Sequence, residues 1–273
     1  MSDTPVRKWG ERRVIDASLS LHHLGDSCQL RYMEQQCQDL LTHLDAVIRN
    51  TLGAAPVRLV QPYSLVRSDL GRCENDEHRL ERALYLQYGR DWKPGSPPFL
   101  PGVCPFFQSF QVMLRNTNED KGWGEIDLLG VSPTWLPAVV ELKDGDAADT
   151  PLRFLAEAAA YGVAVRKAWA DPEGLLRKPW EELMRKRSGL ALDLPAILPE
   201  CPLICAAPAV YWDRVLGRLR PRGTVRAAAW PVFRQLVQQL EARHFPVSFV
   251  SLTSTGVDAQ HLPMNVQAVL FQP

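Results

Sequence analysis

The stretch GWGEIDLLGVSPTWLPAVVELKDG, Gly122–Gly145, decides the fold because it holds two short apolar runs around a Ser-Pro connection. Runs of this length that are bounded by turn residues are typical of β-strands, here expected over 123–131 and 138–143. Both runs carry charge where a buried strand should not: Glu125 and Asp127 in the first, and Glu141 and Lys143 in the second.

The charges fall on one face of each expected strand, because strand side chains alternate between faces. The charged faces hold Glu125, Asp127, Leu129 and Val131 in the first strand, and Val139, Glu141 and Lys143 in the second. The apolar faces hold Ile126, Leu128 and Gly130, and then Ala138, Val140 and Leu142. If the strands are neighbours, Asp127, Glu141 and Lys143 converge on one spot.

Such a spot favours binding of a hard cation. Two carboxylates held close together repel each other unless a proton or a cation lies between them. Mg²⁺ takes oxygen ligands from carboxylates and carbonyls, and the carbonyl of Leu142 would add one to those of Asp127 and Glu141. A bound cation lowers the pKa of a water, and Lys143 would lie beside that water. The expected reaction is hydrolysis of a phosphodiester.

The pattern around this stretch predicts a mixed α/β domain, with one central sheet flanked by helices. Helices are expected over residues 30–52, 74–89, 149–170, 178–189 and 230–244. Further strands are expected over residues 106–115, 202–212, 246–252 and 265–271. We divide the chain into an N-terminal helical extension, residues 1–70, and a domain over residues 71–273. The extension could serve dimerisation or partner docking, so a homodimer or a larger defence or repair complex fits.

Asp127, thirteen intervening residues and then Glu141-Leu142-Lys143 resemble the motif of the PD-(D/E)XK nuclease superfamily. This superfamily includes many restriction enzymes, RecB-like nucleases and Holliday-junction resolvases. The resemblance implies a restriction-endonuclease-like core and a metal-dependent deoxyribonuclease. It also implies that Asp127 and Glu141 bind Mg²⁺ or Mn²⁺ and that Lys143 is the catalytic lysine.

Further site candidates lie on the expected helix before the strands. Some members of the superfamily carry an acidic residue there, which Glu77 or Glu81 would match, and we take Glu81 as the candidate. Glu125 shares the face of Asp127 and is either a supporting residue or a bystander. His78, next to Glu77, is expected at the surface.

The helix after the lysine supplies two more candidates, Glu157 and Tyr161. RecB-like members carry Gln-x-x-x-Tyr there, whereas this chain has Glu157-Ala-Ala-Ala-Tyr161, which departs from that subgroup. Spacing of four residues also allows Glu157 to pair with Arg153. A proline often precedes the first acidic residue in the superfamily, but Ile126 stands there.

The predicted strands around Asp127 and Glu141-Leu142-Lys143 support this interpretation more than the motif residues alone do. Glu119-Asp120-Lys121 has the same Glu-x-Lys pattern, but it lies in a polar turn without an apolar strand. The competing explanation is a ladder of cross-strand ion pairs on a solvated sheet face. Such a ladder requires polar neighbours, and Leu129, Val131 and Val139 are apolar.

Charge and composition allow nucleic acid without requiring it. The formal net charge is zero, with 31 basic and 31 acidic residues, so a basic face requires acids elsewhere. Two basic runs flank the expected core, and we expect phosphate contacts from Lys186, Arg218, Arg220 and Arg222. DNA is the expected partner, although the motif fits RNA as well.

No signal-peptide pattern, long apolar segment or paired zinc-ligand spacing stands out, so we expect a cytoplasmic protein without membrane association and with free thiols at all six cysteines. The main functional alternative is a nuclease-like fold that does not cleave and acts as a nucleic-acid-binding or protein-interaction module.

Overall fold

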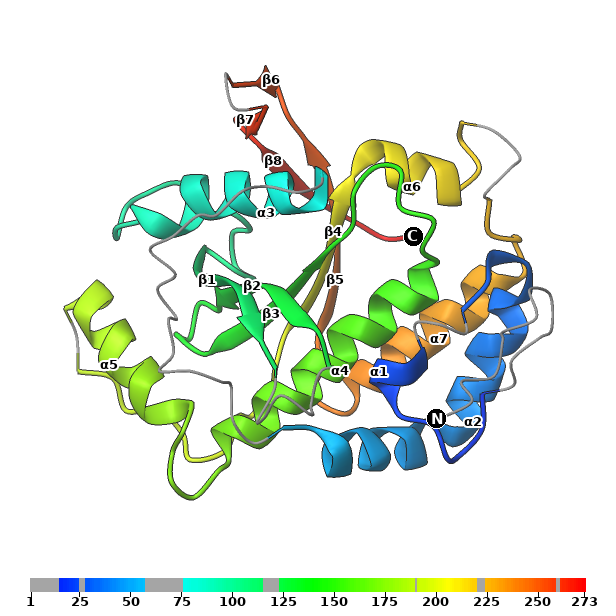
Figure 1. The fold of residues 1–273 in the computed structure, drawn as a ribbon, viewed down its shortest axis with the longest axis horizontal. Coiled ribbons are helices and arrows are strands. Elements are labelled where there is room, and N and C mark those ends of the chain that lie inside the picture. The colour runs from blue at the N-terminus through cyan, green and yellow to red at the C-terminus, as the bar shows by residue number, and fades with distance from the viewer. Residues whose placement is uncertain are drawn as a thin grey trace, which may run out of the picture.

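The computed structural model describes residues 15–24, 28–56, 76–114, 123–189, 191–219, 224–258 and 261–273. Its centre is a six-stranded mixed sheet in the order β1-β2-β3-β4-β5-β8, beside a two-stranded hairpin, β6-β7 (Figure 1). The strands are β1 (Phe106–Met113), β2 (Glu125–Val131), β3 (Pro137–Leu142), β4 (Leu203–Pro208), β5 (Val247–Thr253), β6 (Gly256–Val257), β7 (Pro263–Met264) and β8 (Gln267–Phe271). β1, β2 and β3 are antiparallel, β3, β4 and β5 are parallel, and β8 returns antiparallel to β5.

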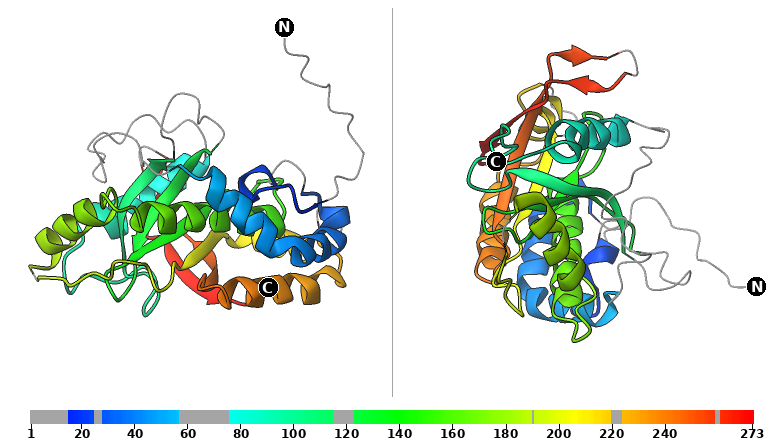
Figure 2. Two further views of the ribbon diagram at one scale, coloured as in Figure 1. Left: turned by 90° about the horizontal axis from the view of Figure 1, so that it is seen from below. Right: turned by 90° about the vertical axis from the view of Figure 1, so that its left-hand side faces the viewer.

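Helices flank this sheet (Figure 2), which confirms the predicted α/β class with a central mixed sheet. The helical segments are α1 (Leu21–Leu24), η2 (Leu30–Tyr32), α2 (Met33–Ala54), α3 (Asp76–Tyr85), η3 (Leu86–Arg90), α4 (Pro151–Trp169), α5 (Arg177–Ser188), α6 (Ala209–Val215) and α7 (Ala229–Glu241). η3 is one turn of π-helix that continues α3.

The sheet separates two hydrophobic cores. On one face, α4 and the helices around it pack on residues such as Leu129 and Val139. On the other face, α3 and η3 pack on Leu128 and Val140. This split confirms the predicted alternation for these four residues. Ile126 is the exception, because it packs in the core of Leu129 rather than in that of Leu128.

Local signals explain where most elements begin and end. The Thr150 hydroxyl accepts a hydrogen bond from the Arg153 amide at 3.0 Å and caps α4, and Pro151 occupies the first turn. Gly189 ends α5 with a φ of 71°, in the left-handed region that favours glycine. The predicted strand over residues 202–212 was too long. β4 stops at Pro208, which has no amide hydrogen to donate, and α6 begins at Ala209.

The described part of the N-terminal region packs on the rest of the chain. α2 lies against α4 and α7, and its buried residues belong to the core of Leu129. Residues 57–75 lie outside the description, so the boundary predicted at residue 70 stays a prediction. In the described ranges no helix has the length and apolar character needed to span a bilayer. Five cysteines are free thiols, and Cys73 lies outside the described residues.

Candidate active site

The candidate site lies where β2 and β3 separate. Their pairing runs from Val131 opposite Pro137 to Leu128 opposite Val140. One residue further along β2, the Asp127 side chain replaces the backbone as the hydrogen-bond acceptor. Its Oδ2 accepts a hydrogen bond from the Leu142 amide, with a nitrogen to oxygen distance of 2.5 Å. The carboxylate is thus held at the opening between the two strands.

A chain of charges crosses this opening to α4. The Lys143 ammonium lies 2.7 Å from Glu141 Oε1 and 3.1 Å from Glu157 Oε2. Glu157 also pairs with Arg153 at 2.9 Å, which confirms that predicted ion pair, and Arg153 reaches Asp149 at 2.9 Å. Lys143 is therefore fixed between one carboxylate of the sheet and one of the helix.

α3 closes the opening from the opposite side. Glu77 and Glu81 are four residues apart and so lie on one face of the helix. One carboxylate oxygen from each of Glu77, Glu81 and Asp127 lies within 4.8 Å of the other two. Carboxylate oxygens are the ligands that hard divalent cations take, so these three oxygens, from α3 and β2, could contribute to a cation site.

The charged groups are buried, which excludes an ion-pair ladder on a solvated face. The exposed fractions are 8% for Asp127, 3% for Glu141 and 6% for Lys143. Glu81 Oε2 and Glu141 Oε2 are buried without a hydrogen-bond partner among the described residues. An unsatisfied buried carboxylate oxygen is costly unless a proton or cation neutralises it.

Burial also controls the protonation of these groups. It raises the pKa of Glu81 to about 8, and neighbouring carboxylates add to the shift. Burial raises the pKa values of Asp127 and Glu141 well above their usual range, although the Lys143 charge opposes both shifts. The acids of the site therefore favour a bound proton or cation at neutral pH.

For Lys143 and Glu157, neighbouring charges outweigh the effect of burial on the pKa. Burial alone would lower the pKa of Lys143, but the surrounding carboxylates, Glu141 first, outweigh burial and raise it well above its usual value. Burial alone would raise the pKa of Glu157, yet the charges of Lys143 and Arg153 hold it below its usual value. Both groups are thus charged at neutral pH.

Two backbone features shape the walls of the site. Gln111 on β1 has a φ of 48°, a left-handed conformation that is uncommon for a residue other than glycine and often marks a functional site. Gly124 has a φ of 72°, and a Cβ there would lie 2.9 Å from the Tyr161 hydroxyl. Glycine therefore lets the chain pass close to Tyr161 as it enters β2.

Together these groups line a cleft of about 260 Å³. Its lining residues are Glu77, His78, Glu81, Gln111, Glu125, Asp127, Glu141, Lys143, Glu157 and Tyr161. All seven residues predicted as catalytic candidates are among them. The backbone of Leu142 borders the cleft as well, because its amide hydrogen points to Asp127. In a strand the carbonyl of a residue faces the same edge as its amide, so the Leu142 oxygen faces β2 too.

Two of the four residues predicted to contact nucleic acid, Lys186 and Arg218, lie outside the cleft. Lys186 is exposed on α5 and pairs with Glu182 at 2.6 Å. Arg218 is exposed after α6 and pairs with Asp213 at 3.2 Å. Arg220 and Arg222 lie outside the described residues, so their predicted role stays a prediction.

Three residues of the cleft were not among the predicted site residues: Glu77, His78 and Gln111. Choosing Glu81 alone on α3 omitted Glu77, although spacing of four residues could have included both. His78 was expected at the surface, but it is half-buried in the cleft wall. Gln111 gave no signal, because its role depends on a backbone conformation that the strand pattern does not encode.

No protein-family model, curated protein or solved structure matches the chain.

Proposed function

We propose that the chain is a metal-dependent nuclease of the PD-(D/E)XK type, with a restriction-endonuclease-like core, that hydrolyses DNA phosphodiester bonds. Support comes from the sequence motif and from the cleft that surrounds it. One observation carries most weight: six carboxylates line the cleft against one ammonium group, that of Lys143. A phosphodiester would be repelled by this set unless cations were bound first.

The donor set fits such a cation. Carboxylate oxygens of Glu77, Glu81 and Asp127 lie within 4.8 Å of one another, and Glu81 Oε2 and Glu141 Oε2 lack hydrogen-bond partners among the described residues. In this proposal Asp127, Glu81 and Glu141 hold Mg²⁺ or Mn²⁺, with Glu77 and the Leu142 carbonyl as further oxygens. When bound, the cation polarises a phosphate oxygen and lowers the pKa of a water.

In this proposal the other residues of the cleft position one another or supply charge. Lys143 keeps its proton in this environment, so it serves as a positive charge that stabilises the developing negative charge on the phosphate. Glu157 holds the Lys143 ammonium from the helix side, and Arg153 holds Glu157. Tyr161 packs against Gly124 and limits the width of the cleft. Glu125 adds negative charge at the cleft wall.

A cleavage assay with a variant that preserves the fold tests the proposal. Asp127→Asn keeps an oxygen acceptor for the Leu142 amide but removes the charge. Supercoiled plasmid, linear duplex, single-stranded DNA and RNA would be incubated with wild type and variant in Mg²⁺, Mn²⁺ or EDTA. We expect cleavage of DNA by wild type alone, and only with a divalent cation.

Asp193→Asn, the same substitution at an exposed position, is the matched control and should cleave like wild type. Cleavage that persists in EDTA or in Asp127→Asn would contradict the proposal. A folded wild type that binds DNA but cleaves no substrate under any condition would instead favour a nuclease-like binding module. Cleavage of RNA alone would retain the chemistry and change the substrate.

A further inference from the structure

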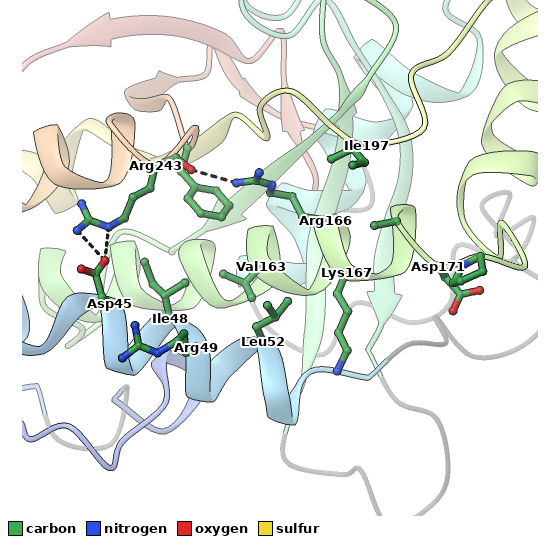
Figure 3. A pocket seen from close by; sticks show the side chains of 13 residues that line it. Asp45, Ile48, Arg49, Leu52, Val163, Arg166, Lys167, Asp171, Ile197 and Arg243 are labelled. Carbon is green, nitrogen blue, oxygen red and sulfur yellow. Dashed lines mark hydrogen bonds and ion pairs between the residues drawn. The ribbon is translucent and has the colours of Figure 1, made fainter.

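A second pocket lies away from the acidic cleft, between α2 and the C-terminal half of α4 (Figure 3). Its volume is about 730 Å³, within the range of about 300–1,000 Å³ that is common for small-molecule sites. Its walls are mainly aliphatic and aromatic, formed by Ile48, Leu52, Val163, Ile197 and Phe245. Leu52 and Ile197 remain 44% and 68% exposed, so this apolar surface is open to a ligand.

Positive charge surrounds these apolar walls. Arg49, Arg166, Lys167 and Arg243 line the pocket, against Asp45 and Asp171. Arg243 is neutralised by Asp45, with an Nη2 to Oδ1 distance of 2.7 Å. The Asp171 carboxylate accepts the backbone amide of Glu173 at 3.0 Å, so it is engaged in its own turn.

The other three cations lack a carboxylate partner among the described residues. Arg166 donates to the Arg243 carbonyl at 3.0 Å, and Lys167 donates to the Ala55 carbonyl at 2.5 Å. These carbonyls lie beyond the C-terminal ends of α7 and α2, where the helix dipole supplies only a partial negative charge. Arg49 makes no hydrogen bond or ion pair to any residue in the described ranges, and it is exposed at the pocket rim.

Both anchored cations keep donors for a ligand. A guanidinium has five N–H donors, of which Arg166 gives one to Arg243, and the Arg166 guanidinium also lies over the Phe245 ring at 5.1 Å. Burial lowers the pKa of Lys167. An anion bound in the pocket would compensate these charges while its apolar part covered Leu52 and Ile197.

We propose that this pocket binds a small organic anion: an aliphatic chain that ends in a carboxylate or a phosphate. The chain would lie on Ile48, Leu52 and Val163, and the charged end would face Arg49 and Arg166. This inference does not depend on the nuclease proposal, because no residue is shared between the two sites.

Titration calorimetry on the full chain, below the micelle concentration of each probe, tests the proposal. Decanoate and decyl phosphate are the two anionic probes, and decanol is the uncharged control. We expect both anions to bind, decanol to bind at least about tenfold more weakly, and affinity to rise about fourfold for each methylene from octanoate to decanoate. The stronger of the two anions identifies the head group.

Arg49→Glu should weaken decanoate binding about tenfold or more, because it reverses a charge at the rim. Arg226→Glu makes the same change at an exposed position outside the pocket and should bind like wild type. Equal affinity for decanol, absence of binding by either anion, or equal loss in both variants would overturn the proposal. Self-association of the ligand-free protein that Leu52→Glu abolishes would assign the pocket to a second copy and would overturn it too.

Discussion

The two halves of α4 face opposite kinds of site. Its N-terminal and central turns supply Glu157 and Tyr161 to a small cleft dominated by buried carboxylates. Its C-terminal half supplies Arg166 and Lys167 to a larger pocket with apolar walls and partly exposed cations. The two sites differ in the sign of their charges and also in how deeply those charges are buried. Burial matters more for energetics, because a buried charge loses more free energy than an exposed one when its partner is removed. Substitutions in the cleft should therefore have much larger effects than those in the pocket.

Asp127→Asn should have the largest effect. It removes one charge from the proposed cation site, so we expect cleavage to fall by about three orders of magnitude or more. The stabilisation of wild type by Mg²⁺, about 2.7 kcal/mol at a concentration of 100 Kd, should also disappear. Thermal unfolding in Mg²⁺ and in EDTA measures the second effect. A full Mg²⁺ shift in the variant would remove Asp127 from the cation site.

Lys143→Ala should reduce cleavage by about 10²- to 10⁴-fold. It also leaves Glu141 buried without its cation and Glu157 with Arg153 alone, which costs about 3–5 kcal/mol of unfolding free energy at pH 8 in EDTA. Protonation of Glu141 at low pH relieves this cost, so denaturant unfolding should show a smaller loss at pH 5. Lys93→Ala, at an exposed position, is the control and should change neither quantity. An equal loss at both pH values would show that packing, not charge, sets the cost.

Glu81→Gln should change how stability depends on pH. The folded chain holds a proton on Glu81 up to about pH 8, whereas an ordinary glutamate releases it near 4.5. Stability in EDTA should therefore fall as pH rises between these values, and the variant should flatten this slope. Denaturant unfolding between pH 4.5 and pH 8 measures this dependence of stability on pH, and Glu241→Gln at an exposed position is the control. An unchanged slope would show that Glu81 titrates normally.

Glu157→Gln should have a modest effect. The amide oxygen can still accept from Lys143, so only the charged part of the interaction is lost, and we expect cleavage to fall by about fivefold or less. Glu157→Ala removes the acceptor altogether and should lose more. If the glutamine variant were as impaired as the alanine variant, the negative charge of Glu157 would be required, and the departure from Gln-x-x-x-Tyr would be functional.

Lys167→Ala should have the smallest effect. Its ammonium donates to backbone carbonyls at the end of α2 and remains partly exposed, so we expect a loss of about 1 kcal/mol of unfolding free energy. Comparison with Lys143→Ala isolates the contribution of burial. Similar losses for both lysines would contradict the distinction between the two ends of α4.

Most of the fold was predictable, because the signals that define it are local. The alternating strands 123–131 and 138–143 and the Thr150-Pro151 helix start depend on neighbouring residues. The end of β4 was missed because apolar residues continue through α6, and only Pro208 separates the two. The hairpin of β6 and β7 was missed because each strand has only two residues.

The cleft was predictable in its strand residues and less so in its walls. Glu141 and Lys143 follow from strand alternation, and Asp127 follows from the pairing of β2 with β3, although the alternation fails at its neighbour Ile126. The contribution of α3 depends on how that helix lies across the sheet, which spacing alone does not determine, so Glu77 and His78 were not assigned. Gln111 reaches the cleft through an unusual backbone conformation. The cationic pocket was not predicted, since its residues come from α2, α4 and two segments far apart in sequence.

The bond between Asp127 and the Leu142 amide links assembly of the site to strand register. A slip of β2 by one residue against β3 would bring Ile126 or Leu128 to this position, and neither side chain can accept the amide hydrogen. The slipped sheet would lose a hydrogen bond and place a methyl group among the carboxylates of α3. The residue proposed to hold the cation thus also selects the correct pairing of the strands as the chain folds.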